Sequence, residues 1–313
     1  METQVLVSII IPMRNAERYI EKTLKSIVSG EYSNIEVIIV DDGSSDDSVA
    51  IIDDFNNSRI RVIQGDCKGI AAAFNKALDV TQGEVVMRCD ADDLYIKNRI
   101  SRQVSWLKQH PDYGAICGNF SMIDKNDEIV NDAFNFGVLS EDITAELNKG
   151  ITRTTFCTYA IKTDVLKKIN GCREYFVTAE DIDLQLRIGE VAKVWYEHKV
   201  NYLYRLHDVS ITHSQPNNQR LFFEQTAREF QIQRLSMGSD DLDNNAPPTP
   251  PSKDNSRAQS ACEHIKSMLI GSAWRLHQSG LKRQALLRVI KALMISPMDF
   301  KIWKSILAMI IKK

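Results

Sequence analysis

Apolar stretches alternate with amphipathic ones through the first third of the chain. The runs at 4–12 and 34–40 are almost entirely apolar, which is typical of parallel strands buried on both faces. Shorter apolar runs at 59–63 and 83–89 predict two further strands. Helical spacing of apolar residues predicts helices between these strands, at residues 16–30, 44–57 and 70–80.

The second third of the chain is less regular but continues the same pattern. The predicted elements are a helix at 97–110, which the stretch 113–124 follows, a strand at 154–161, a helix at 178–190, and one or two strands within 192–208. Strands and helices that alternate with short connections predict an α/β fold, a Rossmann-like, mostly parallel sheet flanked by helices.

The last quarter of the chain differs in composition. Residues 238–260 include four of the eight prolines and almost nothing to bury, so we expect a flexible linker there. Residues 261–313 contain ten Lys/Arg and two acidic residues, a balance of +8 in a chain whose net charge is −2. This basic amphipathic helical tail indicates an anionic partner. The alternative is a basic helical surface that is only solvated.

The remaining bulk features are ordinary. The chain is 43% hydrophobic and 26% charged, as expected for a globular protein. We expect no signal peptide and no membrane-spanning segment, because the first residues lack a basic leader and no apolar run is long enough. The six cysteines form no ligand-like spacing, and we expect them to be reduced, in a cytoplasmic protein.

Polar residues end three of the predicted strands. These are the segments Pro12–Asn15, Asp41–Gly43 and Asp90–Asp93. In open α/β sheets ligands bind beyond the carboxyl ends of the strands, so we expect the three segments to converge on one site.

The stretch VVMRCDADDLY, residues 85–95, carries the strongest cluster of acids. Asp90 and Asp92 follow a buried strand and can offer oxygens to a hard cation such as Mg²⁺ or Mn²⁺, which prefers to share its ligands with phosphate. The alternative is an acidic, solvated turn. Asp93 is expected only to shape that turn.

Two further acidic segments allow both a structural and a functional interpretation. Asp42 lies in a turn before residues that can cap the next helix, yet an acid at this strand tip can also bind a nucleobase or ribose. In TAEDIDLQLRIG, Thr178 and Asp181 fit a capping box, but Asp181 or Glu180 could instead act as a general base. His207 is a lone histidine that matters only if it approaches a metal.

Taken together and in order, six segments resemble the bacterial family 2 glycosyltransferases of the GT-A fold. They cover roughly residues 5–215 and read VSIIIPMRN, VIIVDDGSSDDS, GIAAAFNKAL, GEVVMRCDADD, AEDIDLQLRI and YRLHDVS. The resemblance implies a catalytic domain at 1–237, with a nucleotide-binding part at about 1–118 and an acceptor part at about 119–237. The linker and the helical appendage lie outside it.

The resemblance also implies roles for matching residues. Asp90 and Asp92 look like the family's DXD motif, with His207 as a further residue near the metal and phosphates. Asp181 corresponds to the catalytic base of the ED motif, supported by Glu180. The nucleotide-sugar would be bound by Pro12, Arg14, Asn15, Asp42, Lys68, Asn75, Arg88, Asp90 and Ala91.

Two positions depart from the family pattern. Arg14 stands where an aromatic residue is common before the asparagine, and Phe74 stands where arginine is common before Asn75. Lys68 or Arg88 can supply the missing positive charge. These departures affect the expected nucleotide contacts and leave the metal and base residues intact.

The expected activity is a metal-dependent, inverting glycosyl transfer from a nucleotide sugar, most simply a UDP-sugar, to a glycan or lipid-linked acceptor of a surface polysaccharide. We expect no nucleic-acid partner. The tail fits peripheral contact with an anionic membrane, at the cytoplasmic face of the inner membrane, or it merely covers the catalytic domain. A non-catalytic module that binds nucleotide sugar or glycan is the alternative. The sequence lacks the glycine-rich loops of dehydrogenases, P-loop enzymes and nucleotidyltransferases.

Overall fold

The computed structural model describes residues 4–131, 139–207, 217–252, 261–278 and 280–311. Its elements divide into two compact units. The first comprises residues 1–120, 134–204 and 218–253, and the second comprises residues 121–133, 205–217 and 254–313. Each unit is described by itself below.

The first unit begins with the predicted alternation of strands and helices. Its parallel part and connecting helices are β1 (Val7–Met13), α1 (Ile20–Val28), β2 (Ile35–Asp41), α2 (Ser48–Phe55), β3 (Ile60–Gln64), α3 (Ile70–Leu78) and β4 (Val85–Arg88). The strands pair in the order β3-β2-β1-β4, all parallel. The predicted strands and helices of this region are thereby confirmed.

The second part of the sheet is antiparallel. It contains β5 (Leu94–Tyr95), β6 (Tyr113–Ile123), β8 (Glu141–Asp142), β9 (Ala160–Lys162) and β10 (Lys193–Arg205), in the order β4-β9-β6-β10-β5 with β8 on β10. The helices of this part are α4 (Arg99–Gln109), α5 (Thr144–Leu147), α6 (Thr163–Lys168), α7 (Glu180–Val191) and α9 (Asn217–Met237). The strand predicted at 154–161 is wrong at its start, where Phe156–Thr158 form a 3₁₀ turn, η1, before β9.

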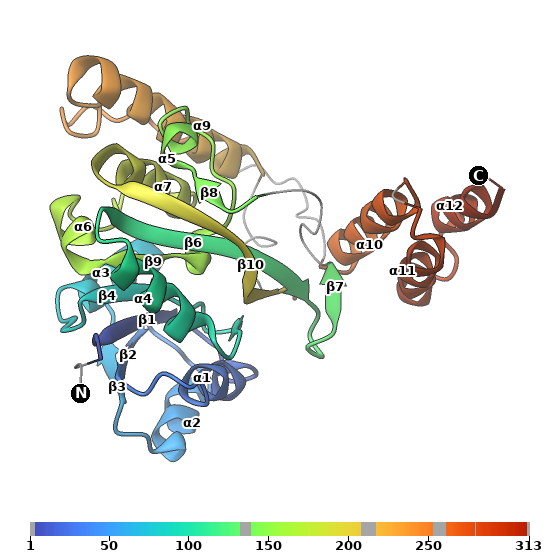
Figure 1. The fold of residues 1–313 in the computed structure, drawn as a ribbon, viewed down its shortest axis with the longest axis horizontal. Helices are drawn as coiled ribbons and strands as arrows, with labels where there is room; N and C mark the ends of the chain where they lie inside the picture. Colours follow the sequence, from blue (N-terminus) through green and yellow to red (C-terminus); the bar gives the residue numbers. More distant parts are fainter. Residues whose placement is uncertain (1–3, 132–138, 208–216, 253–260, 279, 312–313) are drawn as a thin grey trace. The chain divides into compact units, whose positions relative to one another are not determined.

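Helices cover both faces of this sheet (Figure 1). On one face Ile9, Ile39 and Met87 pack against apolar residues of α1, α2 and α4. On the other face Ile10 and Ile38 pack against α3, α5, α6 and α7. Because β1 and β4 are buried on both sides and their sequences are largely apolar, their tips are the places available for polar chemistry.

Residues 238–252 differ from the predicted flexible linker. Asp240 is fully buried and forms ion pairs with Arg173 and Arg234, both at 2.5 Å. The Tyr175 hydroxyl donates to the Pro248 carbonyl at 2.6 Å. The segment contributes few apolar side chains, so its packing rests on ionic and backbone contacts that composition does not reveal. The rest of the predicted linker, 253–260, lies outside the described residues.

The second unit combines β7 (Ile129–Asn131) with α10 (Ala261–Gln278), α11 (Lys282–Ile295) and α12 (Phe300–Ile311). Its core is formed by Val130 of β7 together with Leu269, Ala273, Ala285, Val289, Ala292, Ile302 and Met309. The helical nature of the tail is confirmed, and a hairpin strand from the middle of the chain completes its core. No helix among the described residues has the length and apolarity needed to cross a membrane.

Candidate active site

Three strand tips meet at one edge of the sheet, as predicted. β1 lies between β2 and β4, with Met13 opposite Asp41 and Ile10 opposite Arg88. The segments that follow these strands therefore begin side by side. This is the edge at which ligands bind in open α/β sheets.

Asn15 joins the first two strand tips. Its backbone is in the left-handed region, with φ of 53°. Its side-chain oxygen accepts a hydrogen bond from the Ser45 backbone N–H at 2.8 Å, and its own N–H donates to the Ser44 hydroxyl at 2.9 Å. Pro12 is buried within β1, whereas Arg14 is exposed at the tip. The asparagine thus shapes the loop, and Arg14 is the accessible cation of this segment.

Asp42 is buried with one carboxylate oxygen unmatched. Its Oδ2 accepts a hydrogen bond from the Gly69 N–H at 2.8 Å, while its Oδ1 is buried with no hydrogen-bond partner among the described residues. A Cβ added at Gly65 would lie 2.7 Å from that oxygen, so only glycine leaves room there. A buried acceptor without a donor costs about 1–3 kcal/mol, so Oδ1 is well placed to receive a donor from a ligand.

Two predicted nucleotide contacts near α3 have different surroundings. Lys68 is exposed in the loop before the helix. The Asn75 amide is engaged with the backbone of Cys172, accepting from its N–H and donating to its carbonyl, both at 2.8 Å. This pair of bonds ties α3 to the loop that leads into α7. The described contacts of Asn75 are therefore structural.

The segment after β4 is held from several sides. The Asp90 N–H donates to the Tyr202 hydroxyl at 3.0 Å, and that hydroxyl donates to Asp93 Oδ2 at 2.6 Å. The Thr23 hydroxyl lies 3.0 Å from the Ala91 carbonyl and 2.8 Å from the Asp93 carbonyl. Asp93 is only 1% exposed, in agreement with the expected structural role. Asp92 is half-buried at the tip of the turn.

Arg88 links this segment to α7. Its side chain is buried, with Nε 2.7 Å from Asp90 Oδ1 and Nη1 3.2 Å from Glu180 Oε1. One guanidinium thus brings together the acid after β4 and the acid at the start of α7. Arg88 was predicted to contact the donor, but its described contacts are with these two carboxylates.

The start of α7 is not a capping box. The residue before the helix is Ala179, in the left-handed region with φ of 60°, and no side chain caps the helix. The capping alternative for Thr178 and Asp181 is wrong, because the backbone turn places Ala179, and not Thr178, at the cap position. Ala179 packs with Phe176, Phe223 and Phe230, which hold the unusual turn in place.

The two acids at the start of α7 have raised pKa values. Burial raises the pKa of Glu180 to about 7, although the Arg88 guanidinium lowers it. Burial likewise raises the pKa of Asp181, and Arg88 again opposes the shift. Carboxylates that hold protons more tightly than usual are better matched to general-base work near neutral pH.

Sequence reasoning missed the ionic support of this helix. Asp183 is fully buried between Arg173 and Arg187, with contacts of 2.5 and 2.8 Å. The spacing of Asp183 and Arg187, four residues apart on a helix, was a usable signal. The contacts of Tyr202 with the segment after β4 were not foreseeable, because 109 residues separate it from Asp93.

Of the residues predicted to hold a metal, Asp90 and Asp92 lie in the same turn of the first unit. His207 follows β10 and belongs to the second unit. Across the described residues, no group of three His, Cys, Asp or Glu side chains is arranged to hold a metal. Mg²⁺ is commonly bound by one or two carboxylates plus substrate phosphates, so the oxygens of Asp90 and Asp92 fit such a cation. One carboxylate oxygen of Asp90, Oδ1, is already paired with the Arg88 guanidinium.

Comparison with known proteins identifies the family. The family model described as glycosyl transferase family 2 matches residues 8–169. The Escherichia coli UDP-Glc:alpha-D-GlcNAc-diphosphoundecaprenol beta-1,3-glucosyltransferase WfaP is 33% identical over 211 residues, 66% of this chain and 80% of its own length. Glycosyltransferase GlyG of Streptococcus pneumoniae is 34% identical over 144 residues, 45% of this chain and 46% of its own.

Solved structures agree on the fold. The S. aureus TarS fragment 1–349, crystallised with UDP-GlcNAc, superposes with a TM-score of 0.61 at 17% identity, covering 96% of this chain and 84% of that one. At this identity the likeness shows the fold alone, a GT-A architecture with helices at its C-terminal end. The strand order, the acidic segment after β4, the acids at the start of α7 and the family match lead to one conclusion: the chain is a glycosyltransferase of family 2.

Proposed function

We propose that this enzyme transfers a sugar from a UDP-sugar, with inversion, to a hydroxyl of a lipid-linked glycan acceptor during surface polysaccharide synthesis. The observation that carries the proposal is the Arg88 bridge, which holds the acids of the β4 tip and of the α7 start in one site. The proposed donor and acceptor follow the activity of the WfaP relative and the UDP-GlcNAc bound to TarS.

Asp181 is the general base in this proposal. Its carboxylate removes the proton from the acceptor hydroxyl as the oxygen attacks the anomeric carbon. The bond between that carbon and the diphosphate oxygen breaks, and the electron pair leaves with UDP. Attack on the face opposite the leaving group inverts the anomeric centre. Glu180, beside the base, keeps Arg88 oriented through its 3.2 Å contact.

The donor would be bound at the tips of β1, β2 and β4. The unmatched Oδ1 of Asp42 is suited to accept the imide N–H of uracil, which would satisfy this buried oxygen. Arg14 and Lys68 are the exposed cations of these tips and would face the phosphates. A divalent cation on Asp92 and Asp90 would supply stabilisation of the charge that develops on the diphosphate. His207 remains a predicted ligand of that cation.

A transfer assay tests the proposal. The purified chain is incubated with individual UDP-sugars, Mn²⁺ and a GlcNAc-diphosphate lipid with a shortened polyprenyl chain, and UDP release and product mass are measured. We expect acceptor-dependent UDP release with one or a few sugars, abolished by EDTA and restored by Mn²⁺. Binding of UDP-sugars without transfer to any glycan acceptor would instead identify a binding module.

A further inference from the structure

The second unit presents apolar side chains on the surfaces of α11 and α12 that point away from its core. In α11, Ala285, Val289 and Ala292 are fully buried. Leu287, Ile290 and Met294 lie on the opposite side of that helix and are exposed, Met294 to 77%. Their spacing of three and four residues makes them one stripe along the helix, here called the α11 stripe.

α12 has the same arrangement. Ile302 and Met309 are buried in the core of the unit. Phe300, Trp303 and Leu307, again spaced by three and four residues, are exposed, with Phe300 at 81%. We call these three residues the α12 stripe. In the same helix Ile306 packs on the core, and the side chains of Ile310 and Ile311 lie outside the described residues.

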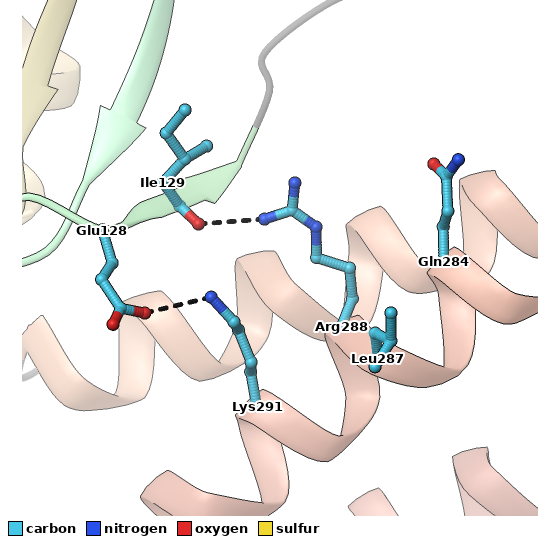
Figure 2. A pocket seen from close by; sticks show the side chains of 6 residues that line it. All are labelled: Glu128, Ile129, Gln284, Leu287, Arg288 and Lys291. Carbon is cyan, nitrogen blue, oxygen red and sulfur yellow. Dashed lines mark hydrogen bonds and ion pairs between the residues drawn. The ribbon is translucent and has the colours of Figure 1, made fainter.

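Contacts on one flank of α11 fix its orientation within the second unit. Arg288 donates to the carbonyls of Ile129 and Val130 at 3.0 and 2.9 Å, and Lys291 lies 3.1 Å from a Glu128 carboxylate oxygen. Figure 2 shows both side chains reaching from α11 toward this segment, around a hollow of about 600 Å³. Leu287 borders this hollow and is 64% exposed. Because the flank and the core side of α11 are occupied, Ile290 and Met294 of the α11 stripe face solvent.

Cations accompany both stripes. Arg283 is exposed one turn before Leu287, and Lys304 is exposed between Trp303 and Leu307. Residues 261–313 carry a net charge of +8 by sequence. Large apolar side chains with Lys and Arg beside them, and a tryptophan among them, are the pattern of helices that lie in the headgroup region of an anionic bilayer.

An exposed apolar set on the first unit lacks this pattern. Leu221, Ile232 and Leu235 of α9 are all exposed by half or more. The same helix carries Glu224 and Glu229, and of its arginines Arg220 is paired with Glu224 and Arg234 with Glu190 and Asp240. Apolar exposure alone would not distinguish α9 from α12, but the acids beside the α9 set, and the pairing of Arg220 and Arg234 with carboxylates, do.

We propose that the α11 and α12 stripes form a docking surface for an anionic membrane leaflet. The helices would lie in the interface, since no described helix can cross a bilayer. The inference deepens the proposed function, because a lipid-linked acceptor is presented at such a surface. Only the biological purpose of the docking surface rests on the proposed function. The surface itself is defined by the α12 stripe, Lys304 and the α11 stripe.

Vesicle co-sedimentation of the full chain tests the docking surface. Vesicles of phosphatidylcholine alone are compared with vesicles that also contain phosphatidylglycerol. We expect the unchanged chain to bind the anionic vesicles and to be released by salt. The triple variant Phe300→Ser, Trp303→Ser, Leu307→Ser should bind at least about tenfold more weakly, whereas Leu221→Ser, Ile232→Ser, Leu235→Ser should bind like the unchanged chain.

A charge variant and two solution measurements complete the test. Lys304→Glu, which leaves the apolar residues in place, should weaken binding to anionic vesicles only. UDP-sugar binding should be equal in all folded variants, so a failed transfer activity would not be confused with failed docking. Equal vesicle binding by the triple variant and the unchanged chain would overturn the proposal. The proposal would also be overturned if the triple variant lost self-association, measured by sedimentation velocity, and kept its vesicle binding.

Discussion

Arg88 is the residue on which the two acidic segments of the site depend. It is buried, and its guanidinium contacts both Asp90 and Glu180. It also lowers the pKa values of Glu180 and Asp181, against the effect of their burial. A general base must be ionised to act, so activity should fall as the pH drops through these raised pKa values.

Replacing Arg88 with Gln should therefore move the acidic limb of the pH–rate profile to higher pH. The substitution removes the positive charge that favours ionised Glu180 and Asp181, so both pKa values rise further. The measurement is kcat/KM for transfer between pH 5 and pH 9, a range of about two pH units on either side of neutrality.

A second arginine provides the control for that experiment. Arg102 forms a half-buried pair with Glu197 at 2.9 Å and contacts neither acid of the α7 start. Arg102→Gln should leave the acidic limb in place. If Arg88→Gln lowered the rate equally at every pH, Arg88 would act on geometry alone and not on the base.

Tyr202 supports the turn that carries Asp90 and Asp92. Its hydroxyl accepts from the Asp90 N–H and donates to the buried Asp93 carboxylate. Tyr202→Phe leaves both groups short of a partner and should lower the free energy of unfolding by about 1–3 kcal/mol, as measured by urea denaturation.

Tyr159 is the matched control for Tyr202. It is equally buried, and among the described residues its hydroxyl reaches no stronger partner than the Cys117 thiol, a weak hydrogen-bonding group. Tyr159→Phe should change the free energy of unfolding by less than about 1 kcal/mol. Similar losses in both variants would mean that the Tyr202 hydrogen bonds do not stabilise the turn.

At the scale of elements, α7 is held by ionic contacts that reach into the segment after α9. Asp183 on α7 and Asp240 beyond α9 share Arg173, and Asp240 also pairs with Arg234. Both acids are fully buried. The helix that starts with the proposed base is thus anchored by residues about 60 positions further along the chain.

Asp240→Asn tests this anchor. It removes a buried charge shared by two arginines, and the free energy of unfolding should fall by about 3 kcal/mol, near the low end for breaking a buried pair, because each arginine keeps a second carboxylate. Asp243→Asn removes a half-exposed charge 3.8 Å from Arg173 and should cost less than about 1 kcal/mol. Equal decreases in the free energy of unfolding of the two variants, measured by guanidinium denaturation, would show that Asp240 is not an anchor.

These elements also show what the sequence could predict. The strands and helices up to β4 follow from periodicity, because the central strands are buried on both faces and each helix on one. The convergence of the strand tips follows from the topology of parallel sheets. The contact of Asn75 with Cys172, the left-handed turn at Ala179 and the packing of 238–252 depend on pairs far apart in sequence, which no local pattern contains.

At the scale of the whole molecule, the chain combines a family 2 glycosyltransferase unit with a helical unit that includes a strand from mid-sequence. The proposed general base and nucleotide contacts belong to the first unit, and the proposed membrane contact belongs to the second. This division makes the two proposals separable, because variants of Phe300 and Trp303 leave the acids of the first unit unchanged.

In the proposed reaction Asp181 removes the proton from the acceptor hydroxyl. Asp181→Asn keeps the size of the side chain and removes its basicity. The decisive measurement is the turnover number of Asp181→Asn alongside its Kd for UDP, by calorimetry in the presence of Mn²⁺. We expect turnover to fall by a factor of about 100 or more, the contribution typical of a general base, with the Kd unchanged. Near-normal turnover with intact UDP binding would show that Asp181 is not the general base, and Glu180 would be the next candidate.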